Sequence, residues 1–129
     1  MSVSWALLCR DAYRKLIGPL RKTARENGYA LAVHGSLARD IDLIAVPWQP
    51  QVSHPMVLIE DLLKVVRSIP ITDTRAEGIG FFKPEESSAY FQAGMPGAKP
   101  HGRLVWSIHL GGGPYLDISV MPPRGLYGD

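Results

Sequence analysis

The sequence of 129 residues contains a single cysteine, Cys9. This composition excludes an internal disulfide framework and a zinc site built from cysteines, because both need several thiols. No apolar run approaches the roughly 18 residues that suggest a transmembrane helix. The first residues also lack the charged and then apolar pattern of a secretory signal. We therefore expect a cytoplasmic protein without a membrane partner.

The sequence also has little excess of one charge over the other. The net charge is only +2, which is too small to indicate nucleic-acid binding by itself. The sequence is 46% hydrophobic and 20% charged, as in ordinary globular proteins, and its length predicts one domain over residues 1–129 with a real core. Thirteen glycines and eleven prolines predict sizeable loops.

Two segments have the periodicity of amphipathic helices. The first runs from about Ser4 to Asn27, with Ser4 as N-cap and Gly28 as its stop, and Gly18-Pro19 should kink or split it. The second runs from about Ser53 to Ser68, with Ser53 as its N-cap. We expect a solvated face for the basic residues of the first helix, and steering of a polyanion is the alternative. These residues are Arg10, Arg14, Lys15, Arg21, Lys22 and Arg25.

The segment after the second helix has a weaker pattern. Gly80-Phe81-Phe82 suggests a brief strand, Pro84 to Gln92 a short helix, and Gly94 to Gly102 an exposed loop. We read His54 as a surface residue. Three tryptophans are expected to pack in the core or at its edge, with platforms for base stacking as the alternative: Trp5, Trp48 and Trp106.

The C-terminal part predicts a β-hairpin. Arg103 to Leu110 and Tyr115 to Met121 both alternate between an apolar and a mixed polar face. Matching like faces places four polar side chains on one side of the hairpin: Ser107, His109, Asp117 and Ser119. This match needs an odd number of loop residues, so we expect a three- or five-residue connection or a bulge. Asp117 is a mid-strand acid, and such acids usually have a cation or a metal as partner.

Residues Ala30 to Trp48 form two short apolar runs around a turn at Gly35-Ser36, and each run predicts a strand. The second run carries Asp40 and Asp42, whose side chains should point the same way because strand side chains alternate. Two adjacent anions repel each other, and a divalent cation would relieve the repulsion. Mg²⁺ is usually held by one or two carboxylates together with waters and phosphates. The alternative is that these acids serve only as turn formers or caps.

The run from Gly35 to Leu43 resembles the nucleotidyltransferase superfamily, which includes DNA polymerase β-like enzymes and minimal nucleotidyltransferases. It reads Gly-Ser-Leu-Ala-Arg and then Asp-Ile-Asp-Leu. The family core has a helix, a strand ending in Gly-Ser, a strand carrying Asp-x-Asp, and a later strand with a third acid. The chain has these parts in the same order, with Asp117 as the third acid. The resemblance implies an α/β (α+β) fold, a mixed β-sheet flanked by helices.

The resemblance also implies an activity, the transfer of a nucleoside monophosphate from a nucleoside triphosphate to an acceptor. Asp40 and Asp42 would bridge two Mg²⁺ ions, and Asp117 would hold the ion that activates the acceptor hydroxyl. Mn²⁺ is the second candidate metal. The phosphates would be contacted by the residues before the acids: Gly35, Ser36 and Arg39. For Arg39, an ion pair with Asp40 or another neighbour is the alternative. The acceptor stays open between a small molecule, a protein and RNA, and so does the oligomeric state.

One departure from the family pattern leaves alternatives open. The family commonly has a longer spacer before Asp-x-Asp, whereas Arg39 here runs straight into Asp40. Either the Gly-Ser backbone donors are aimed differently, or the nucleotide site is degenerate. The second hypothesis is therefore an inactive member that binds a nucleotide or a partner protein, and the third is a structural protein. A mixed site of His34, His109 and an acid, suited to Zn²⁺ or Mn²⁺, is a further alternative.

Overall fold

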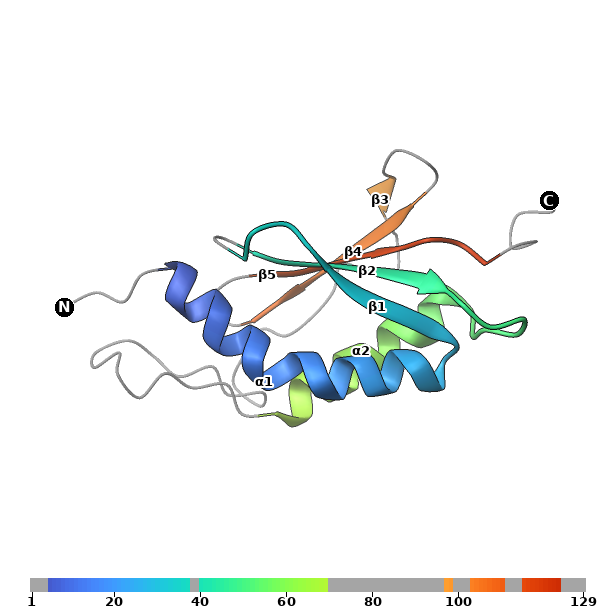
Figure 1. Ribbon diagram of the computed structural model, residues 1–129, viewed down its shortest axis with the longest axis horizontal. Helices are drawn as coiled ribbons and strands as arrows, with labels where there is room; N and C mark the ends of the chain where they lie inside the picture. The colour runs from blue at the N-terminus through green and yellow to red at the C-terminus, as the bar shows by residue number, and fades with distance from the viewer. Residues whose placement is uncertain (1–4, 38–39, 70–96, 99–102, 111–114, 124–129) are drawn as a thin grey trace.

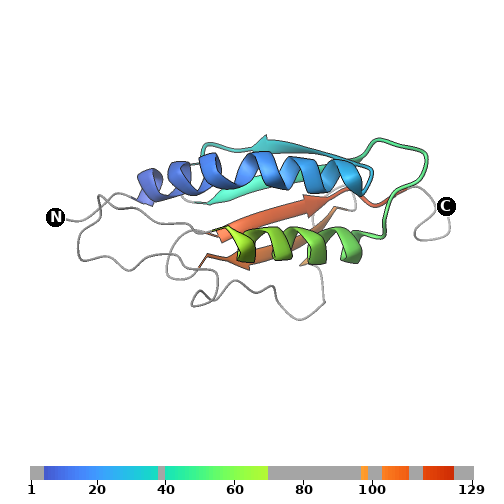
Figure 2. The ribbon, with the colours of Figure 1, turned by 90° about the horizontal axis from the view of Figure 1, so that it is seen from below.

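The described helices and strands form one sheet covered on one face by two helices. The computed structural model describes residues 5–37, 40–69, 97–98, 103–110 and 115–123. Its elements are α1 (Trp5–Glu26), β1 (Tyr29–His34), β2 (Ile41–Pro47), α2 (Pro55–Ser68), β3 (Gly97–Ala98), β4 (Leu104–His109) and β5 (Tyr115–Val120). Both helices lie on the same side of the sheet (Figure 1), and Figure 2 shows them side by side in front of it. The predicted mixed α/β fold is confirmed.

The five described strands pair in the order β1-β2-β5-β4-β3. Strands β2 and β5 are parallel, and the other neighbours are antiparallel, so the sheet is mixed. Parallel neighbours need a crossover connection, and the one between β2 and β5 contains α2. This crossover brings the C-terminal strand next to the strand that follows the Gly-Ser turn.

The register of the C-terminal hairpin agrees with the predicted match of faces. Ser107 pairs with Asp117, and His109 pairs with Tyr115. Five residues, 110–114, lie between the paired ends, which is one of the predicted lengths of the connection. The exposed-loop prediction for 94–102 is wrong at Gly97–Ala98, because these residues pair with β4. The predicted elements at 80–82 and 84–92 lie outside the described residues.

The first helix continues through Pro19 and is bent along its length in Figure 1. Proline removes a backbone donor and clashes with the preceding turn, so the predicted kink is confirmed, but the helix is not split. Gly28 ends it with φ +89°, a conformation that favours glycine. A Cβ at Gly28 would lie 2.7 Å from Cγ1 of Val52, so this turn also requires the absence of a side chain.

The second helix begins two residues later than predicted, at Pro55. Its N-cap is His54, whose Nδ1 accepts the backbone N–H of Met56 at 3.1 Å, so the prediction of Ser53 as the cap is wrong. The Pro55 ring suits the first helical position, where no intrahelical donor is needed. The imidazole of His54 thus caps α2 in place of the hydroxyl group that was predicted to do so.

The core lies between the helices and the sheet face that they cover. Its largest fully buried side chains include Leu16, Leu20, Leu43, Leu58, Leu62 and Ile118. Full burial of such a side chain stabilises a fold by roughly 1.5–3 kcal/mol. Trp106 is also buried, as predicted, whereas Trp48 is 69% exposed and does not pack in the core, which was one of its two predicted places. No described helix combines the length and the apolar character that crossing a membrane would require.

Candidate functional site

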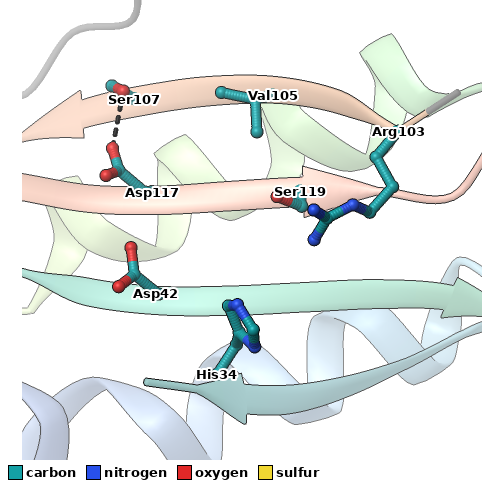
Figure 3. A pocket seen from close by; sticks show the side chains of 7 residues that line it. All are labelled: His34, Asp42, Arg103, Val105, Ser107, Asp117 and Ser119. Atoms are coloured by element: carbon teal, nitrogen blue, oxygen red, sulfur yellow. Dashed lines mark hydrogen bonds between the residues drawn. The ribbon is translucent and has the colours of Figure 1, made fainter. Parts of the chain in front are cut away.

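The sheet register places two acids from distant parts of the chain next to each other. Asp42 on β2 is the parallel partner of Asp117 on β5. Both carboxylates project from their strands on the face that the helices leave uncovered (Figure 3). The sequence suggested this convergence only through the family resemblance, because nothing local to Asp117 identifies the strand beside it.

Asp40 has a different position from the other two acids. The predicted strand does not include it, because β2 begins one residue later, at Ile41. Asp40 lies in the bend before the strand, and its Oδ1 accepts the backbone N–H of Tyr115 at 3.3 Å. It therefore ties the start of β2 to the start of β5, and its negative charge still acts on Asp42.

Several interactions raise the pKa of Asp42. The largest is burial, which disfavours the carboxylate, and the charges of Asp117 and Asp40 act in the same direction. A hydrogen bond with Asp117 also raises this pKa, and only His34 lowers it. Negative charge is therefore in excess around Asp42, as expected of a place that attracts a cation.

The Asp117 carboxylate is held in place by Ser107 on the neighbouring strand. Ser107 Oγ donates a hydrogen bond to Asp117 Oδ1 with an oxygen-to-oxygen distance of 2.6 Å. The dashed line in Figure 3 marks this contact, and the Asp42 carboxylate lies on the opposite side of Asp117. One oxygen of Asp117 is thus engaged by the hydroxyl, which orients the side chain.

A pocket of about 330 Å³ lies over these side chains. Its lining comprises His34, Asp42, Arg103, Val105, Ser107, Asp117 and Ser119. The two carboxylates occupy one end, and the guanidinium group of Arg103 lies towards the other, beside Ser119 (Figure 3). A ligand that carries both a cation and negatively charged groups would match this distribution of charge.

Arg103 and Ser119 are pocket residues that the sequence did not identify as functional. Side chains alternate along a strand, so Arg103, four residues before Ser107, was expected on the same face as Ser107 and Asp117. Its place in the pocket could therefore have been predicted from the sequence. His34 lines the pocket, whereas His109 does not. The His109 ring instead contacts the Tyr115 ring edge-on, and the two ring centroids are 4.3 Å apart. The structure thus separates the two histidines of the mixed His/carboxylate alternative.

The Gly-Ser turn lies directly beside Asp42. Gly35 has φ +94°, and a Cβ there would lie only 3.1 Å from Asp42 Oδ2. The absence of a side chain at Gly35 therefore leaves space for the Asp42 carboxylate. It would also let a phosphate approach the backbone, as predicted. Ser36 is exposed next to it, and Arg39 lies outside the described residues. Of the connection between β1 and β2, the described residues 35–37 and 40 contain no helix, in keeping with its shortness.

The carboxylate ligands in the pocket suit Mg²⁺ better than metals that need a site built entirely from protein side chains. Within the described ranges, no group of three or more His, Cys, Asp or Glu side chains is placed to hold a metal ion. A cage made entirely of protein side chains is therefore not formed there. Mg²⁺ seldom uses such a cage, and one or two carboxylates plus phosphate oxygens are enough. Asp42 and Asp117 meet this smaller requirement.

The pocket brings together ionisable side chains from four strands or their ends. No family model and no curated protein matches the chain. The described ionisable side chains that line the pocket are the Asp42 and Asp117 pair, His34 beside it, and Arg103 across the pocket.

Proposed function

We propose that this chain is a cytoplasmic nucleotidyltransferase, of the minimal type that its sequence resembles. It would transfer a nucleoside monophosphate from a nucleoside triphosphate to an acceptor, with the help of a divalent metal. The observation that supports this best is the pairing of Asp42 with Asp117 in a pocket that also contains Arg103. Paired acids near a guanidinium group fit a ligand made of phosphates and a cation.

The acids fit Mg²⁺, with Mn²⁺ as the second candidate. Asp42 and Asp117 would hold the ion, and Asp40, whose charge acts on Asp42, would be the remaining ligand among the three predicted acids. When bound, the metal would neutralise charge on the phosphates and favour ionisation of the acceptor hydroxyl. The raised pKa of Asp42 is consistent with this role, because a nearby cation would stabilise its carboxylate.

The other pocket residues would position the nucleotide. Nucleotidyl transfer depends on in-line positioning and on neutralisation of developing charge, with little covalent chemistry by the protein. Arg103 would donate to oxygens of the triphosphate through its planar guanidinium group. Ser107 would keep the Asp117 carboxylate oriented. Gly35, Ser36 and Arg39 remain the predicted phosphate contacts before the acids.

A second candidate is a catalytically inactive member that binds a nucleotide or a partner protein. The observation that favours it is the short connection between β1 and β2, whose described residues form bends and no helix. Fewer backbone donors would then face a triphosphate, so a nucleotide would be bound without the alignment that transfer needs.

Transfer and binding can be separated with two measurements. Nucleoside triphosphates labelled at the α-phosphate are incubated with the protein, Mg²⁺ and candidate acceptors: small hydroxyl compounds, protein and RNA. Label should reach an acceptor with the wild type and not with Asp42→Asn. Glu60→Gln is the matched control, because Glu60 is an exposed acid on α2, on the helix side of the sheet. Calorimetry that shows Mg²⁺-dependent binding without transfer would favour the inactive binder, and the absence of both would refute the proposal.

A further inference from the structure

A second hollow lies at the other end of the β1–β2 hairpin. It has a volume of about 370 Å³ and is lined by residues of α1, β1 and the segment after β2. We call it the arginine–tryptophan groove after Arg21, Arg25 and Trp48. Trp48 comes directly after β2 and follows Asp42 by six residues, or about 20 Å of extended chain at about 3.3 Å per residue. The groove and the carboxylate pocket share no lining residue and are therefore separate.

Trp48 presents an indole ring to solvent from a fixed backbone. The side chain is 69% exposed, although tryptophan is among the largest apolar residues. Its backbone N–H donates to the carbonyl oxygen of Gly28 at 3.0 Å, which ties it to the turn after α1. A large aromatic ring at the edge of a groove is a platform on which another flat ring can stack.

Two arginines line the same groove. Arg21 and Arg25 are four residues apart on α1, so their side chains lie on one face of the helix. Arg21 Nε donates to the carbonyl oxygen of Leu31 at 3.3 Å, which directs its guanidinium group to the edge of the sheet. None of the described residues that line the groove is acidic. The groove therefore combines positive charge with an aromatic surface.

We propose that the arginine–tryptophan groove binds single-stranded nucleic acid. A base would stack on Trp48, and neighbouring phosphates would be bound by Arg21 and Arg25. A nucleotide carries both an aromatic face and a negative charge, whereas an acidic peptide carries mainly the charge. This favours a nucleic acid as the ligand. The proposal goes beyond the proposed transfer reaction and does not depend on it, because the groove contains neither Asp42 nor Asp117.

The test is fluorescence anisotropy of a short labelled oligo(dT) and a matching oligo(U), titrated with the full chain at several salt concentrations. Two phosphate contacts predict a slope of about −1.4 for the logarithm of the binding constant against that of the salt concentration. Trp48→Leu should weaken binding about tenfold, since stacking is lost while an apolar side chain remains. Arg25→Gln should weaken binding and make the slope less negative by about 0.7. Arg14→Gln is the matched control, an exposed arginine of the same helix outside the groove, and should change affinity less than about twofold.

Several results would overturn the inference. Unchanged affinity of a folded Trp48→Leu variant, checked by circular dichroism, would exclude stacking. Displacement of the oligonucleotide by polyglutamate at equal charge concentration would show an acidic-peptide surface instead. Asp42→Asn should bind the oligonucleotide like the wild type, because Asp42 does not line the groove. The binding test therefore stays valid even if the chain transfers no nucleotide. Loss of binding in Asp42→Asn would place the strand in the carboxylate pocket and refute the groove as its site.

Discussion

Replacing Asp42 by asparagine should stabilise the fold when no metal is present. Burial and the charges of Asp117 and Asp40 raise the pKa of Asp42, so its ionised form is disfavoured in the folded chain. Asparagine has nearly the same shape without the charge, and its amide can donate to the Asp117 carboxylate. The variant should therefore be more stable than the wild type at neutral pH, even though it would lose the proposed activity.

The size of the effect follows from the sheet geometry. Adjacent strands lie about 4.8 Å apart. Two unit charges about 5 Å apart repel by roughly 0.8 kcal/mol in bulk water and roughly 3 kcal/mol at the effective dielectric near a protein surface. Asp42 and Asp117 are both only partly buried, so solvent screens their repulsion and the lower part of this range applies. We expect a gain of about 1 kcal/mol, which corresponds to a rise of about 3–5 °C in Tm for a chain of this length.

The gain should depend on pH in a defined direction. Well below the ordinary pKa of 3.8, Asp42 is protonated in the folded and unfolded chains, and the charge contributes no difference. Between this value and its raised pKa in the folded chain, the folded chain binds more protons than the unfolded one. The wild type therefore loses stability relative to Asp42→Asn as pH rises through this window, and the difference is largest above it.

Thermal unfolding in buffer with a chelator, followed by circular dichroism from acidic to neutral pH, measures this difference. Glu60→Gln controls for the loss of one negative charge elsewhere on the chain. A lower Tm of Asp42→Asn at neutral pH would refute the reasoning, because it would mean that His34 and Arg103 more than compensate for the acidic neighbours. If the proposed function holds, Mg²⁺ and nucleotide at about 100 times Kd should stabilise the wild type by about 2.7 kcal/mol and leave the variant unchanged.

Three further substitutions test the local geometry. Gly35→Ala should destabilise the fold by about 1–2 kcal/mol in urea unfolding, because φ is +94° and the new Cβ would lie 3.1 Å from Asp42 Oδ2. Gly18→Ala, a helical site with no atom within 4 Å of the added Cβ, is its control and should be neutral or stabilising. Ser107→Ala should cost about 1 kcal/mol through loss of the 2.6 Å hydrogen bond to Asp117, and an unchanged Tm would argue against that bond. His54→Ala should lower the stability by about 0.5–1 kcal/mol as α2 loses its cap, whereas Ser53→Ala should not if His54 alone caps the helix.

Much of the fold was determined by patterns within short stretches of sequence. The first amphipathic helix was predicted because neighbouring helical turns place residues three and four apart on one face, and the buried face of α1 includes Leu16 and Leu20. The common face of Ser107 and Asp117 followed from alternation in two adjacent strands, and the structure shows that the two residues are also direct partners. Both features depend on interactions between residues close in the chain, so the sequence contains the information needed to predict them.

The site required information that no short stretch contains. Asp42 and Asp117 are neighbours because a crossover through α2 places β5 parallel to β2, and burial of the whole core selects that strand order. The choice of His54 over Ser53 as the helix cap and the exposure of Trp48 depend on how the chain leaves β2. The sequence alone thus determined the two helices, the four longer strands and the common face of Ser107 and Asp117. The tertiary structure decided which faces meet, because burial and strand pairing act between residues far apart in the chain.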